Sequence, residues 1–437
     1  MKTKKAIKIK NILKGVLIIS SLMSIGYTGN SKEPEQSFRV ALSVSPFTNT
    51  MINMGYTFED SSGNKATTVS ELQQLFIKHG ANEVFVLIAT DRYSPKQNIT
   101  DHSLERALER AKMAAELGLP LNPEIGLFKH YGAVHAQPSP DFSEYPEIKL
   151  PGPWETLTVE EMAMALKQYG TIVAKELVLT GVKVNIWEIG NEVDFGIAGV
   201  APKPLPGALT TELGYNWYRA PDKVNPAIGK KSIYSLLRTS SKSRIKWCEE
   251  NLWPYQAVLM RAVKEGILSV VPDAKFTTHI SGNGAVNSDF AVAFYRAMSE
   301  NGFDVDEAGF SFYPSSSTSP RNRLEAFQST VKAVNQELGL PVFIAEFAYP
   351  AAPLKSGPFK SWNYQQNKYE LTPEGQAAIL RDLTSWGVKN GLCGIRYWAP
   401  DLIVPLWEGF SLFSVSGMRA TARPALDSIS RGLANPD

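Results

Sequence analysis

The chain has 437 residues, enough for one large barrel or for two to three ordinary domains. Hydrophobic residues make up 43 % and charged residues 20 %, which excludes a mainly disordered protein, and only two Cys exclude a disulfide scaffold or a Cys-rich zinc module. Residues 1–30 contain six Lys and no acid, so the remainder holds 39 basic against 43 acidic residues, a net charge of −4. This balance lacks the basic surface that nucleic acid requires, and it favours a neutral or weakly charged ligand.

The N-terminus predicts an export signal. A Lys-rich stretch at 1–14 is followed by an apolar run at 15–26 and then by small and polar residues. That run is shorter than the roughly 20 residues that span a bilayer, and no Cys follows it to carry a lipid anchor. We therefore expect a signal peptide at 1–30, a secreted or periplasmic protein, and no stable membrane insertion after cleavage. The alternative is an uncleaved signal anchor.

Eight short apolar runs rich in β-branched residues predict β-strands, with helical periodicity between them. Polar caps and prolines mark where the helices begin. The predicted strands cover residues 38–43, 83–89, 119–128, 184–190, 275–280, 308–313, 342–346 and 394–398, and the helix starts are marked by Thr68, Ser103, Thr158, Pro254, Pro320, Thr372 and Pro373.

This alternation predicts an α/β fold with a parallel sheet, and eight units in about 400 residues predict a (β/α)8 TIM barrel. A doubly wound open sheet is the alternative, but no Gly-rich phosphate loop follows the first predicted strand. We expect a single catalytic domain over residues 36–437, with no cofactor.

Two long connections, at 129–158 and 193–251, leave the C-terminal ends of predicted strands, where barrel active sites lie. The second contains an aromatic cluster of Tyr215, Trp217 and Tyr218. We expect both connections to wall the substrate site, although long surface excursions are also tolerated without a function.

Two glutamates end two predicted strands. Glu192 closes the sequence Trp187-Glu188-Ile189-Gly190-Asn191-Glu192, and Glu346 lies in Phe343-Ile344-Ala345-Glu346-Phe347. In a barrel the fourth and seventh strands can face each other across the rim, so these carboxyls can converge. Paired carboxyls perform glycoside hydrolysis, and Asn191 is placed to hydrogen-bond a sugar 2-hydroxyl.

These motifs resemble clan A of the glycoside hydrolases and, within it, family 53, the arabinogalactan endo-β-1,4-galactanases. Ile189-Gly190-Asn191-Glu192 is similar to the acid/base motif of that family, and Glu346 with Ala348-Tyr349-Pro350 is similar to its nucleophile motif. The sequence Gly309-Phe310-Ser311-Phe312-Tyr313-Pro314 resembles its sixth strand, and Tyr397-Trp398 also matches in spacing.

The resemblance implies an exported retaining hydrolase of a β-linked plant oligo- or polysaccharide, with β-1,4-galactan as the first expectation. Glu192 would be the general acid/base and Glu346 the nucleophile, with the carboxyls about 5–5.5 Å apart. The pKa of Glu192 should then be raised by an apolar site or by the charge of Glu346.

The residues that we expect to bind substrate lie at the other strand ends. Tyr313 should hydrogen-bond Glu346, and Trp398 should form a stacking floor for a sugar ring. The remaining expected substrate-binding residues are Asn191, His130 and His279. The five His show no metal-ligand spacing, so we expect no catalytic metal.

One departure from the family concerns its strand-two Arg, which is absent from residues 83–89; Arg92 lies just beyond. Two alternatives therefore stay open: a clan A hydrolase of different specificity, acting on mannan or glucan or in exo mode, and a non-catalytic carbohydrate-binding barrel.

Overall fold

The computed structural model describes residues 38–94, 101–205, 218–317 and 319–434. The expected signal peptide lies outside these residues, and so do Tyr215 and Trp217. The segment Ser37–Asp437 forms one compact unit. In the part of the chain that is described, no helix is both long and apolar enough to cross a membrane.

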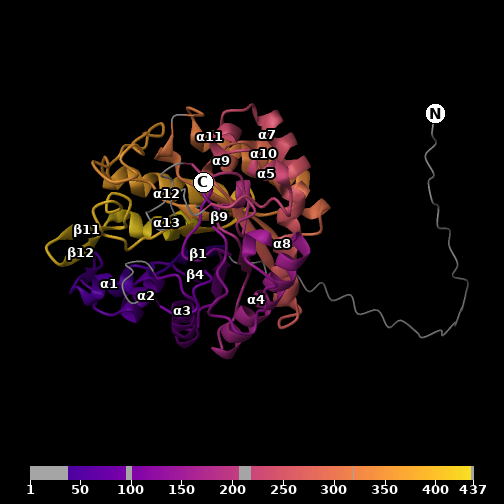
Figure 1. Ribbon diagram of the computed structural model, residues 1–437. Coiled ribbons are helices and arrows are strands. Elements are labelled where there is room, and N and C mark those ends of the chain that lie inside the picture. Colours follow the sequence, from indigo (N-terminus) through magenta and orange to yellow (C-terminus); the bar gives the residue numbers. More distant parts are fainter. Residues whose placement is uncertain (1–37, 95–100, 206–217, 318, 435–437) are drawn as a thin grey trace, which may run out of the picture. The chain divides into compact units, whose positions relative to one another are not determined.

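Eight parallel strands form the central sheet (Figure 1) in the order β1-β10-β9-β8-β7-β6-β5-β4. The two outer strands of this order return to each other, because Asn82 N–H donates to the carbonyl of Val40 (3.0 Å) and Phe85 N–H donates to Ser43 Oγ (2.8 Å). The predicted (β/α)8 barrel is confirmed. Its strands are β1 (Arg39–Leu42), β4 (Val84–Ile88), β5 (Leu121–Ile125), β6 (Trp187–Ile189), β7 (Phe276–Ile280), β8 (Glu307–Phe312), β9 (Val342–Phe347) and β10 (Leu392–Tyr397).

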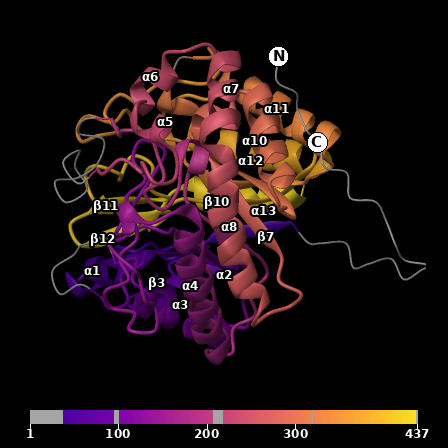
Figure 2. The ribbon, with the colours of Figure 1, turned by 45° about the vertical axis from the view of Figure 1, so that its right-hand side comes forward.

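Long helices connect the strands and cover the outside of the barrel. Figures 1 and 2 show α4 and α8 side by side, and two glycines explain why they approach so closely. A Cβ at Gly170 would lie 2.5 Å from the carbonyl oxygen of Val263, and one at Gly266 would lie 2.2 Å from that of Lys167. The connecting helices are α2 (Val69–Lys78), α3 (Leu104–Glu116), α4 (Val159–Leu179), α8 (Trp253–Leu268), α10 (Ser288–Glu300), α11 (Arg323–Leu338) and α12 (Pro373–Lys389).

Most of the predicted helix starts are confirmed. Thr68 and Thr158 form capping boxes, and Ser103 and Thr372 cap α3 and α12 through their hydroxyls. The prediction at Pro320 is wrong, because α11 begins at Arg323 with Asn322 as its cap. The Asn322 side chain accepts the N–H of Glu325, so a polar cap rather than a proline sets this start.

A second sheet was not predicted. Its strands have only two to four residues, too few to show a period-2 pattern. Short helices also lie within the long connection at 193–251 and in other connections between the strands. The sheet has the order β11 (Phe413–Ser416), β12 (Arg419–Ala422), β2 (Thr57–Glu59) and β3 (Lys65–Ala66); the helices are α1 (Thr48–Asn53), α5 (Pro226–Gly229), α6 (Ile233–Leu237), α7 (Ser241–Asn251), α9 (Gly282–Ala285) and α13 (Ser428–Ala434).

Two buried arginines lie inside the barrel. Arg39 at the start of β1 forms ion pairs with Glu83 (2.8 Å) and with Glu307. Arg396 in β10 forms ion pairs with Glu124 and Glu188, each at 2.9 Å. The Arg39 group lies toward the N-terminal ends of the strands, whereas the Arg396 group lies toward the ends that carry the candidate site. The two cysteines, Cys248 and Cys393, are free thiols.

Candidate active site

Glu192 follows β6 in an unusual backbone conformation. Its φ of 48° and ψ of 56° place it in the left-handed region, which costs free energy for a residue other than glycine. Gly190, with φ 86°, turns the chain just before it, and a Cβ there would lie 2.3 Å from Cγ1 of Val193. This sharp turn carries the Glu192 carboxyl over the C-terminal rim of the barrel.

Glu346 lies in β9, where the strand register shifts. Phe310 and Ser311 of β8 pair with Ile344 and Glu346, so Ala345 is an extra residue in β9, and the pairing with β10 shifts over the same region. Such a β-bulge re-aims the side chain that follows it. Glu346 is only 6 % exposed, and its carboxyl accepts hydrogen bonds from Tyr313 Oη (2.6 Å) and Ser311 Oγ (3.2 Å). The expected bond from Tyr313 is therefore present.

The charge of Glu346 acts on the carboxyl of Glu192. Burial, followed by the charges of Glu346 and Asp194, raises the pKa of Glu192 to about 8. The N–H of Val134 donates to Oε2 of Glu192 (3.2 Å), which opposes this shift only in part. Glu192 therefore holds its proton near neutral pH, as a general acid requires.

Asn191 and Tyr131 complete the surroundings of the pair. Asn191 donates through Nδ2 to the carbonyl of Gly132 (2.8 Å), while its buried Oδ1 has no hydrogen-bond partner of normal geometry among the described residues. The Tyr131 phenol lies near Asn191, and burial, followed by the charges of Glu346 and Glu192, raises its pKa. An unsatisfied buried acceptor is costly, and the expected hydrogen bond between Asn191 and a sugar 2-hydroxyl stays a prediction.

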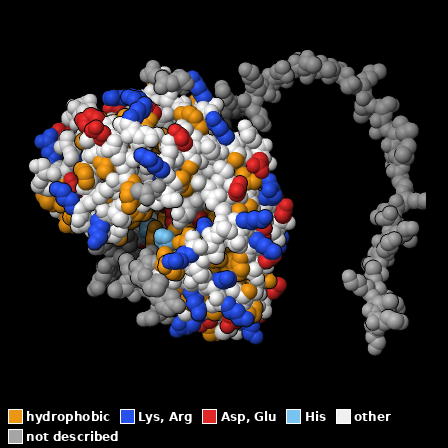
Figure 3. All heavy atoms as spheres, turned by 90° about the horizontal axis from the view of Figure 1, so that it is seen from above, with side chains coloured by type: hydrophobic (Ala, Val, Ile, Leu, Met, Phe, Trp, Pro, Cys, Tyr) orange, Lys and Arg blue, Asp and Glu red, His pale blue; other side chains and the backbone are white. Residues whose placement is uncertain are grey.

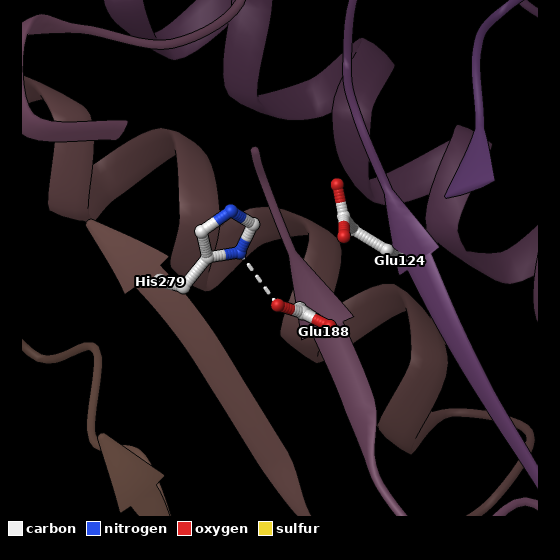
Figure 4. Close-up of side chains that lie close together, drawn as sticks. All are labelled: Glu124, Glu188 and His279. Atoms are coloured by element: carbon white, nitrogen blue, oxygen red, sulfur yellow. Dashed lines mark hydrogen bonds and ion pairs between the residues drawn. The ribbon is translucent and has the colours of Figure 1, made fainter. Parts of the chain in front are cut away.

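Below the rim, three neighbouring strands supply side chains that point toward one another: Glu124 from β5, Glu188 from β6 and His279 from β7 (Figure 4). Nδ1 of His279 lies 2.6 Å from Oε1 of Glu188. Burial alone would raise the pKa of Glu188, but the charge of Arg396 and the hydrogen bonds from His279 and Arg396 outweigh it and hold that pKa below its usual value. Burial and the charge of Glu188 raise the pKa of Glu124 to about 8, so this group has one firmly ionised carboxylate.

His279 links this buried group to Glu192. Burial lowers its pKa and Glu188 raises it, to about 9. The backbone N–H of Glu192, however, donates to Nε2 of His279 (3.2 Å), and a protonated Nε2 has no lone pair to accept it. We therefore assign the neutral ring with its proton on Nδ1, donated to Glu188.

Glu124, Glu188 and His279 offer ligand atoms within 4.8 Å of one another, close enough to hold a metal ion. The guanidinium of Arg396 donates to both carboxylates in the same space. A fixed organic cation thus already supplies the positive charge that a metal would bring, and these donors do not fit a resident ion.

Trp398 follows β10 and lines a pocket at the C-terminal ends of β1, β4 and β10, together with Ser43, Phe85, His102 and Arg110. Its ring packs against Trp407 (centroids 4.7 Å apart), which in turn contacts the ring of Tyr313. The partly exposed Trp398 therefore joins the pocket to the surroundings of Glu346, and its stacking role stays a prediction.

The other residues expected near the substrate lie in three different environments. His130 is partly exposed and pairs with Asp91 through Nδ1, so its substrate contact stays a prediction. His279 is fully buried beneath the rim. Arg92 cannot replace the strand-two Arg near Glu346, because it forms ion pairs with Glu147 (3.2 Å) and Glu176 (2.9 Å).

Sequence reasoning missed Tyr131, Ser311, Glu124 and Arg396. Ser311 lies inside the motif at 309–314 that resembles the sixth strand of the family, and Tyr131 directly follows His130. Glu124 had a usable signal, since a carboxylate within an apolar strand must find a buried partner. No local pattern identifies Arg396 as that partner, because the two are 272 residues apart.

An α/β barrel with a protonated carboxyl and a hydrogen-bonded carboxylate at its C-terminal rim defines the class of barrel glycoside hydrolases. The sequence model of Glycosyl hydrolase family 53 matches residues 43–422. The chain belongs to this family and is a glycoside hydrolase.

Known proteins agree with this assignment. The Endo-beta-1,4-galactanase of Bacillus subtilis (strain 168) is 23 % identical over 367 residues, which cover 80 % of this chain and 67 % of that protein. The solved Ignisphaera aggregans GH53 catalytic domain is 19 % identical with a TM-score of 0.64, covering 92 % of this chain and 98 % of that one. A structure of fungal beta-1,4-galactanases is 19 % identical with a TM-score of 0.63, covering 90 % and 99 %.

Proposed function

We propose that the chain is an exported, retaining endo-β-1,4-galactanase. The observation that carries the reaction type is the coupled pair at the rim: Glu192, whose pKa is raised to about 8, beside Glu346, which accepts two hydrogen bonds from β8. The substrate follows from the similarity to endo-beta-1,4-galactanase.

The proposed reaction has two displacements. In the first, a carboxylate oxygen of Glu346 attacks the anomeric carbon while Glu192 gives its proton to the leaving glycosidic oxygen. In the second, Glu192 takes a proton from water, whose oxygen attacks the same carbon and releases Glu346. Two inversions leave the anomeric configuration unchanged.

The charge distribution fits a neutral polysaccharide. On the face seen in Figure 3, basic and acidic side chains are interspersed rather than gathered into one large area of a single sign. Trp398 and the adjacent pocket offer an aromatic surface and polar groups suited to a sugar ring.

A reducing-sugar assay on galactan, mannan, β-glucan and xylan tests the substrate, with Glu346→Ala as the inactive control. Turnover of galactan with retention, followed by NMR of the freshly released anomer, supports the proposal. Turnover of another polysaccharide alone moves the chain to a different specificity, and binding without turnover makes it a carbohydrate-binding barrel.

Export is tested separately, by N-terminal sequencing of protein recovered outside the cytoplasm. We expect the mature chain to start between Gly26 and Lys32. A chain that retains residues 1–30 in the membrane fraction would support the signal-anchor alternative instead.

A further inference from the structure

The side chain of Arg396 is only 1 % exposed, and each of its three guanidinium nitrogens donates a hydrogen bond within the barrel. Nη1 donates to Glu188 Oε2 (2.9 Å), Nη2 to Glu124 Oε2 (2.9 Å), and Nε to the carbonyl oxygen of Ala345. Its Cζ also lies 3.6 Å from the ring centroid of Phe85. A planar fork of donors can make these contacts at once, whereas the point charge of a lysine cannot.

One arm of this fork reaches the nucleophile side of the site. Ala345 is the extra residue of the bulge in β9 and directly precedes Glu346. A bulge leaves the local ladder irregular, so the bond from Nε of Arg396 holds the carbonyl of Ala345 in place. The direction of the Glu346 side chain depends on that peptide.

The Nη1 group of Arg396 is linked to the acid/base residue Glu192 through Glu188 and His279. Glu188 accepts from Arg396 and binds Nδ1 of His279 (2.6 Å), and Nε2 of His279 accepts the backbone N–H of Glu192 (3.2 Å). Glu192 has a left-handed backbone, which persists only where surrounding contacts hold it. The chain of contacts from Arg396 therefore ends at the peptide that sets the position of the Glu192 carboxyl.

We propose that Arg396 is the positioning residue of the catalytic pair, holding Glu346 through Ala345 and Glu192 through Glu188 and His279. This inference rests on the proposed function. The positive charge beneath the pair comes from β10, while β4 supplies the aromatic ring of Phe85 on which the guanidinium lies. Exchanging the two side chains would keep a stacked cation and ring inside the barrel, with the cation supplied by β4 instead of β10.

The test uses the full chain with Arg396→Lys, Arg396→Phe, the double variant Phe85→Arg/Arg396→Phe, and Arg39→Met as the matched control. Arg39 is also buried and paired with two glutamates, and it also lies over an aromatic ring, Phe343 (4.1 Å). It belongs to the group at the other end of the barrel, so its replacement removes a buried cation without removing any bond to Glu188, Glu124 or Ala345.

We expect Arg396→Phe to lower kcat on the wild-type substrate about 100-fold, with KM changed less than about threefold, because both carboxyls lose their alignment. The acidic limb of its pH–rate profile should move to higher pH, since carboxylates near a lost cation gain protons more easily. Arg396→Lys should keep the acidic limb at the wild-type pH but have a lower kcat. The double variant should recover about tenfold over Arg396→Phe, and Arg39→Met should keep both the kcat and the limb.

The inference is overturned if folded Arg396→Lys and Arg396→Phe match the wild type in kcat and pH profile. It is also overturned if Arg39→Met loses as much kcat as they do, or if the double variant recovers nothing. Should Arg396→Phe not fold, the kcat and pH profile of Arg396→Lys decide. A wild-type chain that hydrolyses no polysaccharide contradicts the proposed function itself, and this inference with it.

Discussion

The protonation of Glu192 is set by burial first and by neighbouring charge second. Glu346 and Asp194 both disfavour a second negative charge nearby, and the resulting pKa of about 8 keeps the carboxyl protonated at neutral pH. Two glutamates of the same chemistry thereby take different roles through their surroundings alone.

The first prediction concerns this proton. Activity that needs protonated Glu192 is present below about pH 8 and is lost as the pH rises through that value. Glu192→Gln should lower kcat on polysaccharide about 100- to 10,000-fold, and its residual activity on an aryl glycoside should lack the basic limb, because an amide does not titrate. The exposed Glu160→Gln is the control and should keep the wild-type profile. A basic limb that persists in Glu192→Gln would refute the assignment.

At the scale of elements, the site depends on how closely β7 and β8 approach. His279 in β7 lies opposite Gly309 in β8. A Cβ at Gly309 would lie 2.7 Å from both Cβ of His279 and the carbonyl oxygen of Thr278. Backbone cannot yield as a flexible side chain can, so this glycine keeps His279 in reach of Glu188 and Glu192.

The second prediction is that Gly309→Ala lowers the free energy of unfolding by about 1–3 kcal/mol, as overpacking in a core does, and lowers kcat by displacing His279. Urea unfolding and steady-state kinetics measure the two effects. Gly152→Ala serves as the control, because its new Cβ would meet only the hydroxyl of Thr156, at 3.1 Å. Unchanged kcat in a folded Gly309→Ala variant would show that His279 does not depend on this spacing.

At the scale of the whole molecule, folding changes the protons that the barrel binds. The pKa values of Glu124 and Glu192 are raised to about 8, so between about pH 4.5 and pH 8 the folded chain holds protons that the unfolded chain has released. Stability must fall as the pH rises through this window. Glu188 acts in the opposite sense, because its lowered pKa gives stability that is lost only as the pH falls below about 4.5. The contribution of these three groups to stability is therefore greatest near pH 5.

The third prediction follows from that linkage. Glu192→Gln removes one of the two groups that oppose folding at higher pH, so its unfolding temperature should exceed that of the wild type by about 2 °C or more at pH 8, with a smaller difference at pH 5. Thermal unfolding at both pH values measures it, with Glu160→Gln again as the control. An equal difference at the two pH values would exclude titration of Glu192 as its cause.

The eight strands, most helix starts and the positions of Glu192 and Glu346 at strand ends could be read from the sequence, because periodicity and capping depend on residues only a few positions apart. The second sheet could not be predicted from the sequence, because its strands are too short to show a period-2 pattern. The partner of Tyr313 was also expected, through a resemblance between motifs rather than through any local rule.

Only the tertiary structure decided which strand supplies the buried cation. Arg396 lies in a predicted apolar strand, but it meets Glu188 and Glu124 from 208 and 272 residues away, so no local pattern could name these partners. The same holds for the left-handed backbone of Glu192 and for the proton on His279. Such features depend on distances between groups that only barrel closure brings together, and on the water that closure excludes, so they have no counterpart in a short stretch of sequence.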